Sequence, residues 1–273
     1  RGFAERAARL GSVRDVDVDA LLAWYERVRR PLPWRATRDP YALLVSEVML
    51  QQTQALRVVA YYERWLARFP DAPSLARAPA RDVLAAWSGL GYNRRALALQ
   101  RAAAVVAARG WPDDLTERPG VGPYTAAAVG SFAWDRQVAA VDTNVRRVLS
   151  RRDGIDHSPR ELAERAQALL PPGRAAVFNQ AMMELGATVC RPRAPRCGEC
   201  PVAAGCAGPR QPRPRRPAVR FEDTDRWARG RVLAALLAGE EPPVQGERRE
   251  RALAGLERDG LVVRGVDGRP RLP

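Results

Sequence analysis

Four cysteines have the clearest chemistry in this sequence. Cys190, Cys197, Cys200 and Cys206 follow the spacing C-x6-C-x2-C-x5-C, and the sequence contains no other cysteine. Structural zinc sites more often use two C-x2-C pairs. One such pair between wider gaps fits a cubic [4Fe–4S] cluster, which separates its four ligands more widely. We therefore expect a [4Fe–4S] cluster, with zinc as the alternative and disulfides as the least favoured reading, because the cysteines are clustered rather than scattered.

Two carboxylates stand in positions where they could do chemistry. Glu47 falls among the apolar residues of a helical pattern, where a carboxyl group loses water and its neutral form is favoured. The alternative is a Glu at the edge of the apolar stripe with its head in solvent. Asp142 directly precedes the next helical pattern, and an Asp in that place is ordinarily an N-cap.

A short turn precedes Asp142 by about twenty residues. The sequence Pro119-Gly120-Val121-Gly122 predicts a hairpin between two short helices, and Pro123 suits the first turn of the second helix. The glycines permit a sharp turn and a close approach by a partner. Free N–H groups at such a helix start can bind phosphate. Such a turn is usually only a turn, so the residues around it decide between the two readings.

The charge balance favours a polyanionic partner. The chain has 273 residues and a formal net charge of +14, with 45 basic and 31 acidic residues. Such an excess is typical of nucleic-acid binding. Every basic residue is arginine, so no lysine ε-amine is available for a Schiff base and only the α-amino group could form one.

No segment has the length and apolar character of a transmembrane helix, and no signal peptide is apparent. We expect a monomeric cytoplasmic protein, associated with the nucleoid and not with a membrane. Because the chain starts at Arg1 and not at Met, we also expect that an N-terminal piece is missing.

The elements that must position these groups are helical. Strand-like alternation is nearly absent up to residue 208, which predicts an all-α main body. Prolines predict an extended segment over 30–35, and His157 is interpreted as a surface residue. A Pro/Arg-rich linker and a small winged-helix-like module with two helices and two short strands complete the chain. The expected helices cover 18–28, the uninterrupted run 41–69, 74–78, 80–87, 94–108, 143–151, 159–169, 174–187, 225–237 and 247–258.

The order of motifs resembles the helix-hairpin-helix DNA glycosylases with an iron–sulfur loop, and most closely the adenine-specific MutY type. The resemblance spans roughly residues 30–206. It rests on PLPWR (31–35), DPYALLVSEVMLQQT (39–53), WSGLGYNRRA (87–96), PGVGPYTAAAVGSFA (119–133), VDTNVRRVLSR (141–151), FNQAMMELGATVC (178–190) and the cysteine loop.

The resemblance implies a domain organisation. Residues 1–36 with 142–208 would form the cluster domain, and 37–141 a helical barrel domain with the hairpin. Residues 209–217 would be the linker, and 218–273 the C-terminal module. Adenine glycosylases of this type usually also carry a Nudix-like C-terminal domain, which the residues after Gly208 are too few to form. We expect this tail to add sequence-blind phosphate contacts through Arg226, Arg229 and Arg231.

The resemblance also implies a reaction: excision of adenine opposite 8-oxoguanine or guanine in double-stranded DNA, after base flipping. Glu47 would be the general acid on the adenine ring, and Asp142 would stabilise the cationic sugar, either by its charge alone or through a covalent intermediate. Tyr124 and Asn144 would line the sugar side. Gln52 and Tyr92 would wedge the duplex. Adenine would be enclosed by Arg30, Leu32, Trp34, Arg35, Leu50 and Gln180, and the DNA backbone would contact Gly120, Val121, Gly122 and Thr125.

Two positions, Thr143 and Tyr124, bear on which branch of the superfamily the chain resembles. Thr143 stands where the adenine branch commonly has Gly, as in the endonuclease III branch. That branch, however, has lysine where Tyr124 stands, which excludes a lysine-based lyase here. With Tyr at this position the chain also resembles the mismatch-specific thymine glycosylases. A thymine or uracil mismatch glycosylase is therefore the alternative enzyme. A non-catalytic iron–sulfur DNA-binding protein is the alternative outside the enzymes.

Overall fold

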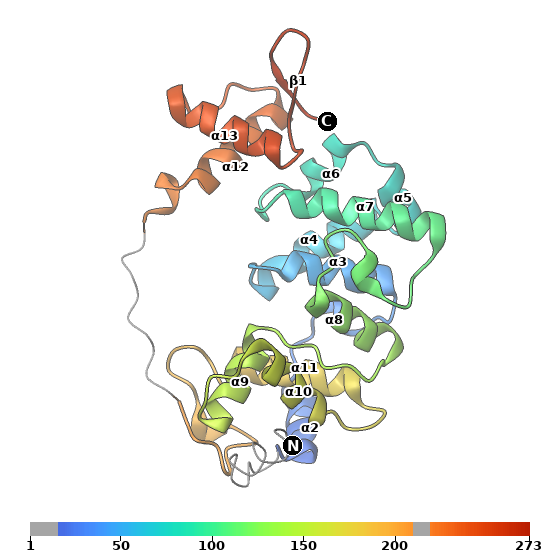
Figure 1. Cartoon of the computed structure of the whole chain (residues 1–273), viewed down its shortest axis with the longest axis vertical. Coiled ribbons are helices and arrows are strands. Elements are labelled where there is room, and N and C mark those ends of the chain that lie inside the picture. Colours follow the sequence, from blue (N-terminus) through green and yellow to red (C-terminus); the bar gives the residue numbers. More distant parts are fainter. Residues whose placement is uncertain (1–15, 210–218) are drawn as a thin grey trace, which may run out of the picture. The chain divides into compact units, whose positions relative to one another are not determined.

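The computed structural model describes residues 16–209 and 219–273 of the chain (Figure 1). Residues 1–15 and almost all of the expected Pro/Arg-rich linker lie outside the described residues. By packing, the chain divides into a first unit, Arg1–Pro40 with Pro123–Pro214, and a second unit, Tyr41–Gly122 with Arg215–Pro273. The expectation of an all-α body is confirmed, because the described residues form helices and one two-stranded sheet.

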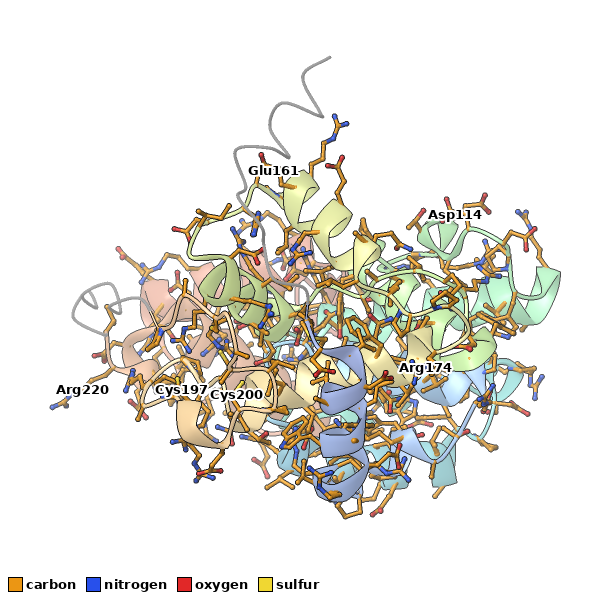
Figure 2. The ribbon with its side chains drawn as sticks, turned by 90° about the horizontal axis from the view of Figure 1, so that it is seen from below. Asp114, Glu161, Arg174, Cys197, Cys200 and Arg220 are labelled. Carbon is orange, nitrogen blue, oxygen red and sulfur yellow. The ribbon has the colours of Figure 1, made fainter. Side chains whose placement is uncertain are left out.

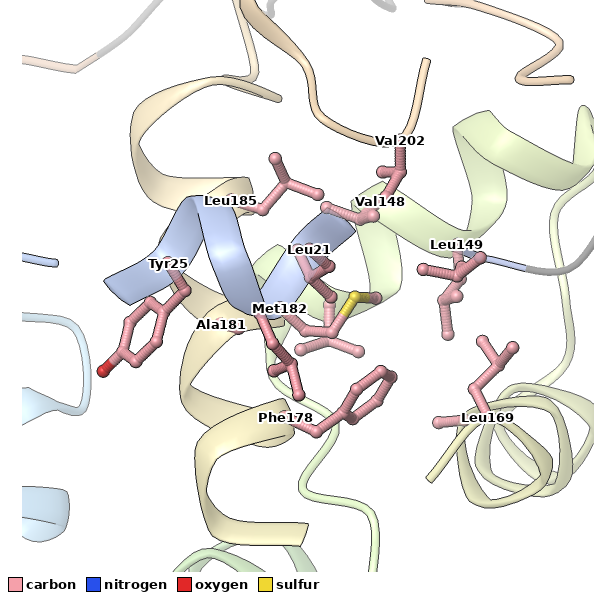
Figure 3. Close-up of a cluster of buried hydrophobic side chains, with 14 of the residues drawn as sticks. Leu21, Tyr25, Val148, Leu149, Leu169, Phe178, Ala181, Met182, Leu185 and Val202 are labelled. Atoms are coloured by element: carbon pink, nitrogen blue, oxygen red, sulfur yellow. The ribbon is translucent and has the colours of Figure 1, made fainter. Parts of the chain in front are cut away.

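The first unit is built on four packed helices, α2, α9, α10 and α11 (Figure 3). Asp17 caps α2 by accepting a hydrogen bond from the Ala20 amide at 2.9 Å. Val202 from the cysteine loop packs into the same cluster, so the loop is anchored in the apolar core. The elements are α2 (Val18–Val28), η1 (Pro33–Arg35), α8 (Pro123–Trp134), α9 (Thr143–Asp153), α10 (Pro159–Ala168), α11 (Ala175–Thr188) and η3 (Cys197–Glu199).

Packing groups α8 with the first unit, whereas we expected residues 123–141 in the barrel domain. The physical reason is that α8 packs against α11. Asn179 of α11 donates hydrogen bonds to the Ser131 hydroxyl and the Val138 carbonyl, both at 2.9 Å. The expected domain boundaries themselves stay a prediction.

The second unit has an aromatic core. The Trp65 ring meets those of Phe69 and Trp87 edge to face, with centroids 5.0 and 5.4 Å apart. Such contacts stabilise beyond simple burial. The elements before the hairpin are α3 (Pro40–Leu50), α4 (Ala55–Arg68), α5 (Ala72–Arg77), α6 (Ala80–Trp87), α7 (Arg94–Arg109) and η2 (Leu115–Glu117).

The C-terminal module has the two helices and two short strands that the sequence predicts. Helices α12 and α13 pack together, and the strands pair antiparallel. Arg229, one of the three arginines that we expect to contact phosphate, forms an ion pair with Asp259, and the expected phosphate contacts stay a prediction. The elements are η4 (Phe221–Asp223), α12 (Asp225–Ala238), α13 (Gly246–Arg258), β1 (Val263–Arg264) and β2 (Pro270–Arg271).

Three local expectations are corrected. The run 41–69 is interrupted after Leu50, where Gln52 takes a left-handed φ of 60°. The segment 30–35 is not wholly extended, because η1 forms at its end. His157 is buried and not a surface residue, since its Nε2 lies 2.8 Å from Asp153 Oδ2. Within the parts of the chain that the structure describes, no helix has the length and apolar character to span a bilayer.

Candidate active site and DNA-binding surface

Asp142 is held at the start of α9 as an N-cap. Its Oδ1 accepts hydrogen bonds from the amides of Asn144 and Val145 at 2.8 and 2.7 Å, and its Oδ2 accepts one from Asn144 Nδ2 at 2.7 Å. Burial raises the pKa of the Asp142 carboxyl, while these hydrogen bonds and the charge of Arg147 oppose that rise. The result is a fixed carboxylate with little water, which is suited to stabilising a nearby positive charge.

Arg147 connects Asn144 to the cysteine loop. Its guanidinium donates to Asn144 Oδ1, to the Gly186 carbonyl and to the Cys190 carbonyl, at 2.7, 2.6 and 2.7 Å. A Cβ at Gly186 would lie 2.5 Å from Asn144 Cβ, so only glycine permits this approach of α11 to α9. The orientation of Asn144 therefore depends on α11 and on the loop.

Glu47 is buried in α3, at 4% exposure. The reading in which its head reaches solvent is thus wrong, and the buried reading is confirmed. All residues from Tyr41 to Met49 are buried, because α3 runs through the interior of the second unit. Leu50, at the end of α3, is partly exposed. Glu47 belongs to the second unit and Asp142 to the first.

Arg30 and Arg35 converge on one buried carboxylate, Glu184 of α11. Arg30 donates to both Glu184 oxygens at 2.8 Å, and Arg35 donates to Oε2 at 2.6 Å. Burial favours the neutral form of Glu184, but the two guanidinium groups outweigh it and lower the carboxyl pKa. Breaking such a buried network would be strongly destabilising. These two arginines therefore position the segment 30–35, whatever else they contact.

The other expected adenine contacts in the first unit lie around the same segment. Leu32 and Trp34 are buried, at 5% and 6% exposure. Gln180 accepts a hydrogen bond from the Tyr25 hydroxyl at 2.8 Å, and the Arg35 guanidinium lies 5.4 Å from the Tyr25 ring centroid. Tyr124 lies in the first turn of α8 and is partly exposed.

Gln52 and Tyr92 lie on two turns that one arginine joins. Both have left-handed backbones, with φ of 60° and 49°, which costs energy for residues other than glycine. Arg95 donates to the carbonyls of Val48 and Gln51 on one turn, at 2.7 and 2.6 Å, and to Gly91 on the other, at 3.0 Å. Burial lowers the pKa of Arg95 to about 10, so it stays charged at neutral pH. Arg95 thus fixes the spacing of the two expected wedge residues.

The hairpin 119–122 packs closely on α7. Gly120 has φ 76°, and a Cβ there would lie 2.8 Å from Ala98 Cβ, so glycine is required for the turn and for the contact. The Val121 amide donates to the Arg118 carbonyl at 3.1 Å within the turn, and the expected DNA-backbone contacts of the hairpin stay a prediction. Gly122 is exposed, whereas Thr125 is buried at 2%. A cavity of about 150 Å³ lies between this hairpin, α3 and α7.

The four cysteines form no disulfide, and Figure 2 shows Cys197 and Cys200 in the same loop. Burial raises the pKa of the Cys200 thiol, and the other three thiols raise it further, so all four are within electrostatic reach. Arg151 lies with Nη1 3.5 Å from Cys190 Sγ and donates to the carbonyls of Arg191 and Pro192. Across residues 16–209 and 219–273, no three His, Cys, Asp or Glu side chains converge closely enough for one metal ion.

Four of these supporting residues had no signal of their own in the sequence. Arg95, Arg147, Arg151 and Glu184 are ordinary charged residues in a chain rich in arginine. The three arginines donate mainly to backbone carbonyls, and Glu184 accepts from Arg30 and Arg35. Only their partners, which are distant in sequence, identify their role.

Comparison with known proteins agrees with this arrangement. Residues 45–172 match the HhH-GPD superfamily of base excision DNA repair proteins. The adenine DNA glycosylase of Mycobacterium tuberculosis is 45% identical over 95% of this chain and 94% of its own length. A thermostable thymine-DNA glycosylase structure is 32% identical, with a TM-score of 0.65 over 70% of this chain and 93% of its own. Endonuclease III in a non-covalent DNA complex is 25% identical, with a TM-score of 0.60 over 69% and 91%.

The helical fold with its hairpin thus defines a base excision DNA repair protein of the HhH-GPD superfamily. Within that superfamily, the chain belongs to the adenine DNA glycosylase family.

Proposed function

We propose that this protein is a monofunctional DNA glycosylase that removes adenine mispaired with 8-oxoguanine or guanine. The observation that carries the proposal is the 45% identity to an adenine DNA glycosylase over nearly the whole of both chains. The buried Glu47 and the capped Asp142 support it, because glycosidic cleavage needs two carboxyl groups in unlike environments.

In the proposed reaction the duplex opens at a wedge and adenine leaves the stack. Gln52 and Tyr92 fill the gap that the flipped adenine leaves in the duplex. Glu47 donates a proton to the adenine ring, so that the base leaves as a neutral molecule. The Asp142 carboxylate stabilises the cationic sugar, and water adds to the anomeric carbon and gives its proton to the Glu47 carboxylate, which restores the acid. Tyr124 and Asn144 line the sugar side, and the adenine contacts are Arg30, Leu32, Trp34, Arg35, Leu50 and Gln180.

The test is a glycosylase assay on four duplexes: adenine opposite 8-oxoguanine, adenine opposite guanine, thymine opposite guanine and uracil opposite guanine. We expect excision from the two adenine duplexes. A mismatch thymine or uracil glycosylase is the second candidate, favoured by Tyr124 and the similarity to a thymine-DNA glycosylase. Excision only from the thymine or uracil duplexes would establish that candidate instead. Tight binding without excision from any duplex would indicate a non-catalytic DNA-binding protein.

The product is expected to be an intact abasic strand. Because the sequence contains no lysine, no side-chain amine can form a Schiff base with the opened sugar. The strand should break only after alkali treatment, and borohydride should trap little protein on DNA. Efficient trapping would contradict this prediction and would point to the α-amino group as the attacking amine.

Cys190, Cys197, Cys200 and Cys206 fit a [4Fe–4S] cluster, since four free thiols lie within seventeen residues with one C-x2-C pair between wider gaps. The cluster would hold the loop rigid, beside Arg191, Arg193 and Arg196. Purified protein should be brown and contain about four iron atoms per chain. Replacing Cys197 by Ser should lower DNA affinity more than the rate of the chemical step. Zinc without iron in anaerobically prepared protein would contradict the prediction.

A further inference from the structure

The exposed ring of Tyr92 lies against an arginine of the C-terminal module. Arg226 of α12 donates a hydrogen bond from Nη1 to the Tyr92 hydroxyl at 2.6 Å, and its guanidinium lies 5.2 Å from the centre of the Tyr92 ring. Both residues belong to the second unit. They are 134 residues apart in the sequence, so only folding brings them together.

Arg226 belongs to a series of alternating aromatic and guanidinium groups. Its guanidinium lies 5.0 Å from the centre of the Phe221 ring, and Arg95 lies 5.4 Å from the Tyr92 ring and 5.3 Å from the Trp87 ring. Tyr92 and Phe221 remain 43% and 49% exposed. An aromatic surface with interleaved guanidinium groups is the kind on which nucleic-acid bases stack.

Among the described residues, no carboxylate oxygen lies within 4.0 Å of the Arg226 guanidinium in an ion pair, although Asp225 is its neighbour in sequence. By contrast, Arg229 one turn along is paired with Asp259. An exposed cation without a counter-ion next to two exposed rings suits a polyanion that also offers flat faces, and DNA has both properties.

The segment that carries Phe221 is held firmly within the module. Thr224 donates from its hydroxyl to the Phe221 carbonyl at 2.6 Å and accepts from the Trp227 amide, which caps α12. Arg248 of α13 donates to the Glu222 carbonyl. The module also meets the preceding helices through Arg81, which donates to the Leu237 carbonyl at 3.0 Å. Phe221 and Arg226 are therefore presented at a defined position.

We propose that Phe221 and Arg226 extend the Tyr92 wedge, so that the C-terminal module takes part in recognising the mispair by stacking on bases beside the wedge. This goes beyond the expectation that the tail adds only sequence-blind phosphate contacts. It rests on the proposed function, because the role of Tyr92 as a wedge comes from the glycosylase family. The match to the M. tuberculosis relative covers 95% of this chain, so it extends into the module that carries these residues.

The test compares Arg226→Ala with Arg231→Ala. Arg231 is the matched control, because it lies on the same helix, is also exposed and also stacks on a ring, that of Trp227 at 5.6 Å, but does not contact Tyr92. The readouts are the dissociation constant for a mispaired and a fully paired duplex, and the fluorescence of 2-aminopurine next to the mispair, which rises when the base unstacks. Thermal midpoints verify that each variant is folded.

We expect Arg226→Ala to weaken mispair binding by roughly 5- to 100-fold, the range for losing one stacking contact. The 2-aminopurine signal should fall, and fully paired DNA should be affected less. Phe221→Ala should behave similarly, whereas Arg231→Ala should weaken both duplexes alike. Arg226→Lys should not restore the signal, because lysine keeps the charge but lacks the planar group.

Three results would overturn the proposal. Equal effects of Arg226→Ala and Arg231→Ala on binding and on 2-aminopurine fluorescence would show that Arg226 contributes only its positive charge. Full rescue by Lys would make it a phosphate contact. Tighter mispair binding by Arg226→Ala would show that the arginine shields Tyr92 from DNA. Failure of the proposed function can be told apart from failure of this proposal. In the first case the wild-type protein removes no adenine in the four-duplex assay, whereas these binding measurements do not depend on excision.

Discussion

Glu47→Gln is expected to lower the single-turnover rate of adenine excision by roughly 10²- to 10⁴-fold, the usual contribution of a general acid. Glutamine keeps the size of the side chain in the buried site of α3 but has no acidic proton to donate. Affinity for mispaired DNA should persist, because Glu47 is buried and is not expected to bind the backbone. The measurement is single-turnover excision from an adenine:8-oxoguanine duplex, together with a binding titration.

The matched control for this prediction is Glu63→Gln. Glu63 lies on α4 of the same unit and is exposed, so the same chemical change there should leave excision unaffected. A Glu47→Gln variant that excises adenine at a near-normal rate would remove the role assigned to Glu47. Loss of DNA binding together with excision would indicate a structural role of the buried carboxyl instead.

Asp142→Asn is expected to lower the excision rate by roughly 10²- to 10³-fold, the effect of losing one preorganised electrostatic contact. Asparagine retains an oxygen that can accept the Asn144 and Val145 amides, so the start of α9 should stay capped while the negative charge disappears. Asp17→Asn is the matched control, because Asp17 caps α2 in the same unit but is exposed. That variant should excise normally, and a near-normal rate in Asp142→Asn would contradict the role of the charge.

The raised pKa of Asp142 predicts how the free energy of unfolding and the excision rate change with pH. In the folded protein, burial places this pKa above its ordinary value of 3.8, so the folded state holds the proton more tightly than the unfolded chain. Stability from this group is therefore present at low pH and is lost as pH rises through the folded pKa. At neutral pH the buried negative charge therefore lowers the free energy of unfolding. Wild-type excision should decrease as pH falls through the raised pKa, because the proton removes the charge.

The positions of most helices are determined locally and are legible in the sequence. Asp17 and Ser158 cap α2 and α10, and Pro159 begins α10, as side-chain hydrogen bonding and the fixed φ of proline require. The apolar periodicity of α2 and the pairing of β1 with β2 also depend only on residues close in sequence. The spacing of the cysteines is likewise local, whereas the sequence left two alternatives for Glu47 and only the packing of α3 decided that it is buried.

Tertiary structure alone decided how these elements act together. Arg95 joins the two expected wedge turns, and Glu184 collects Arg30 and Arg35, through contacts that span from a few to more than a hundred residues of sequence. His157 was wrongly expected at the surface because its burial depends on the packing of α10 near Asp153, to which Arg165 of α10 also donates. The sequence by itself determined the family, the helices and the candidate carboxylates, since these depend on neighbouring residues and motif order. Only the packing of helices that are distant in sequence determines the carbonyl or ring that each arginine contacts, as for Arg226 and Tyr92.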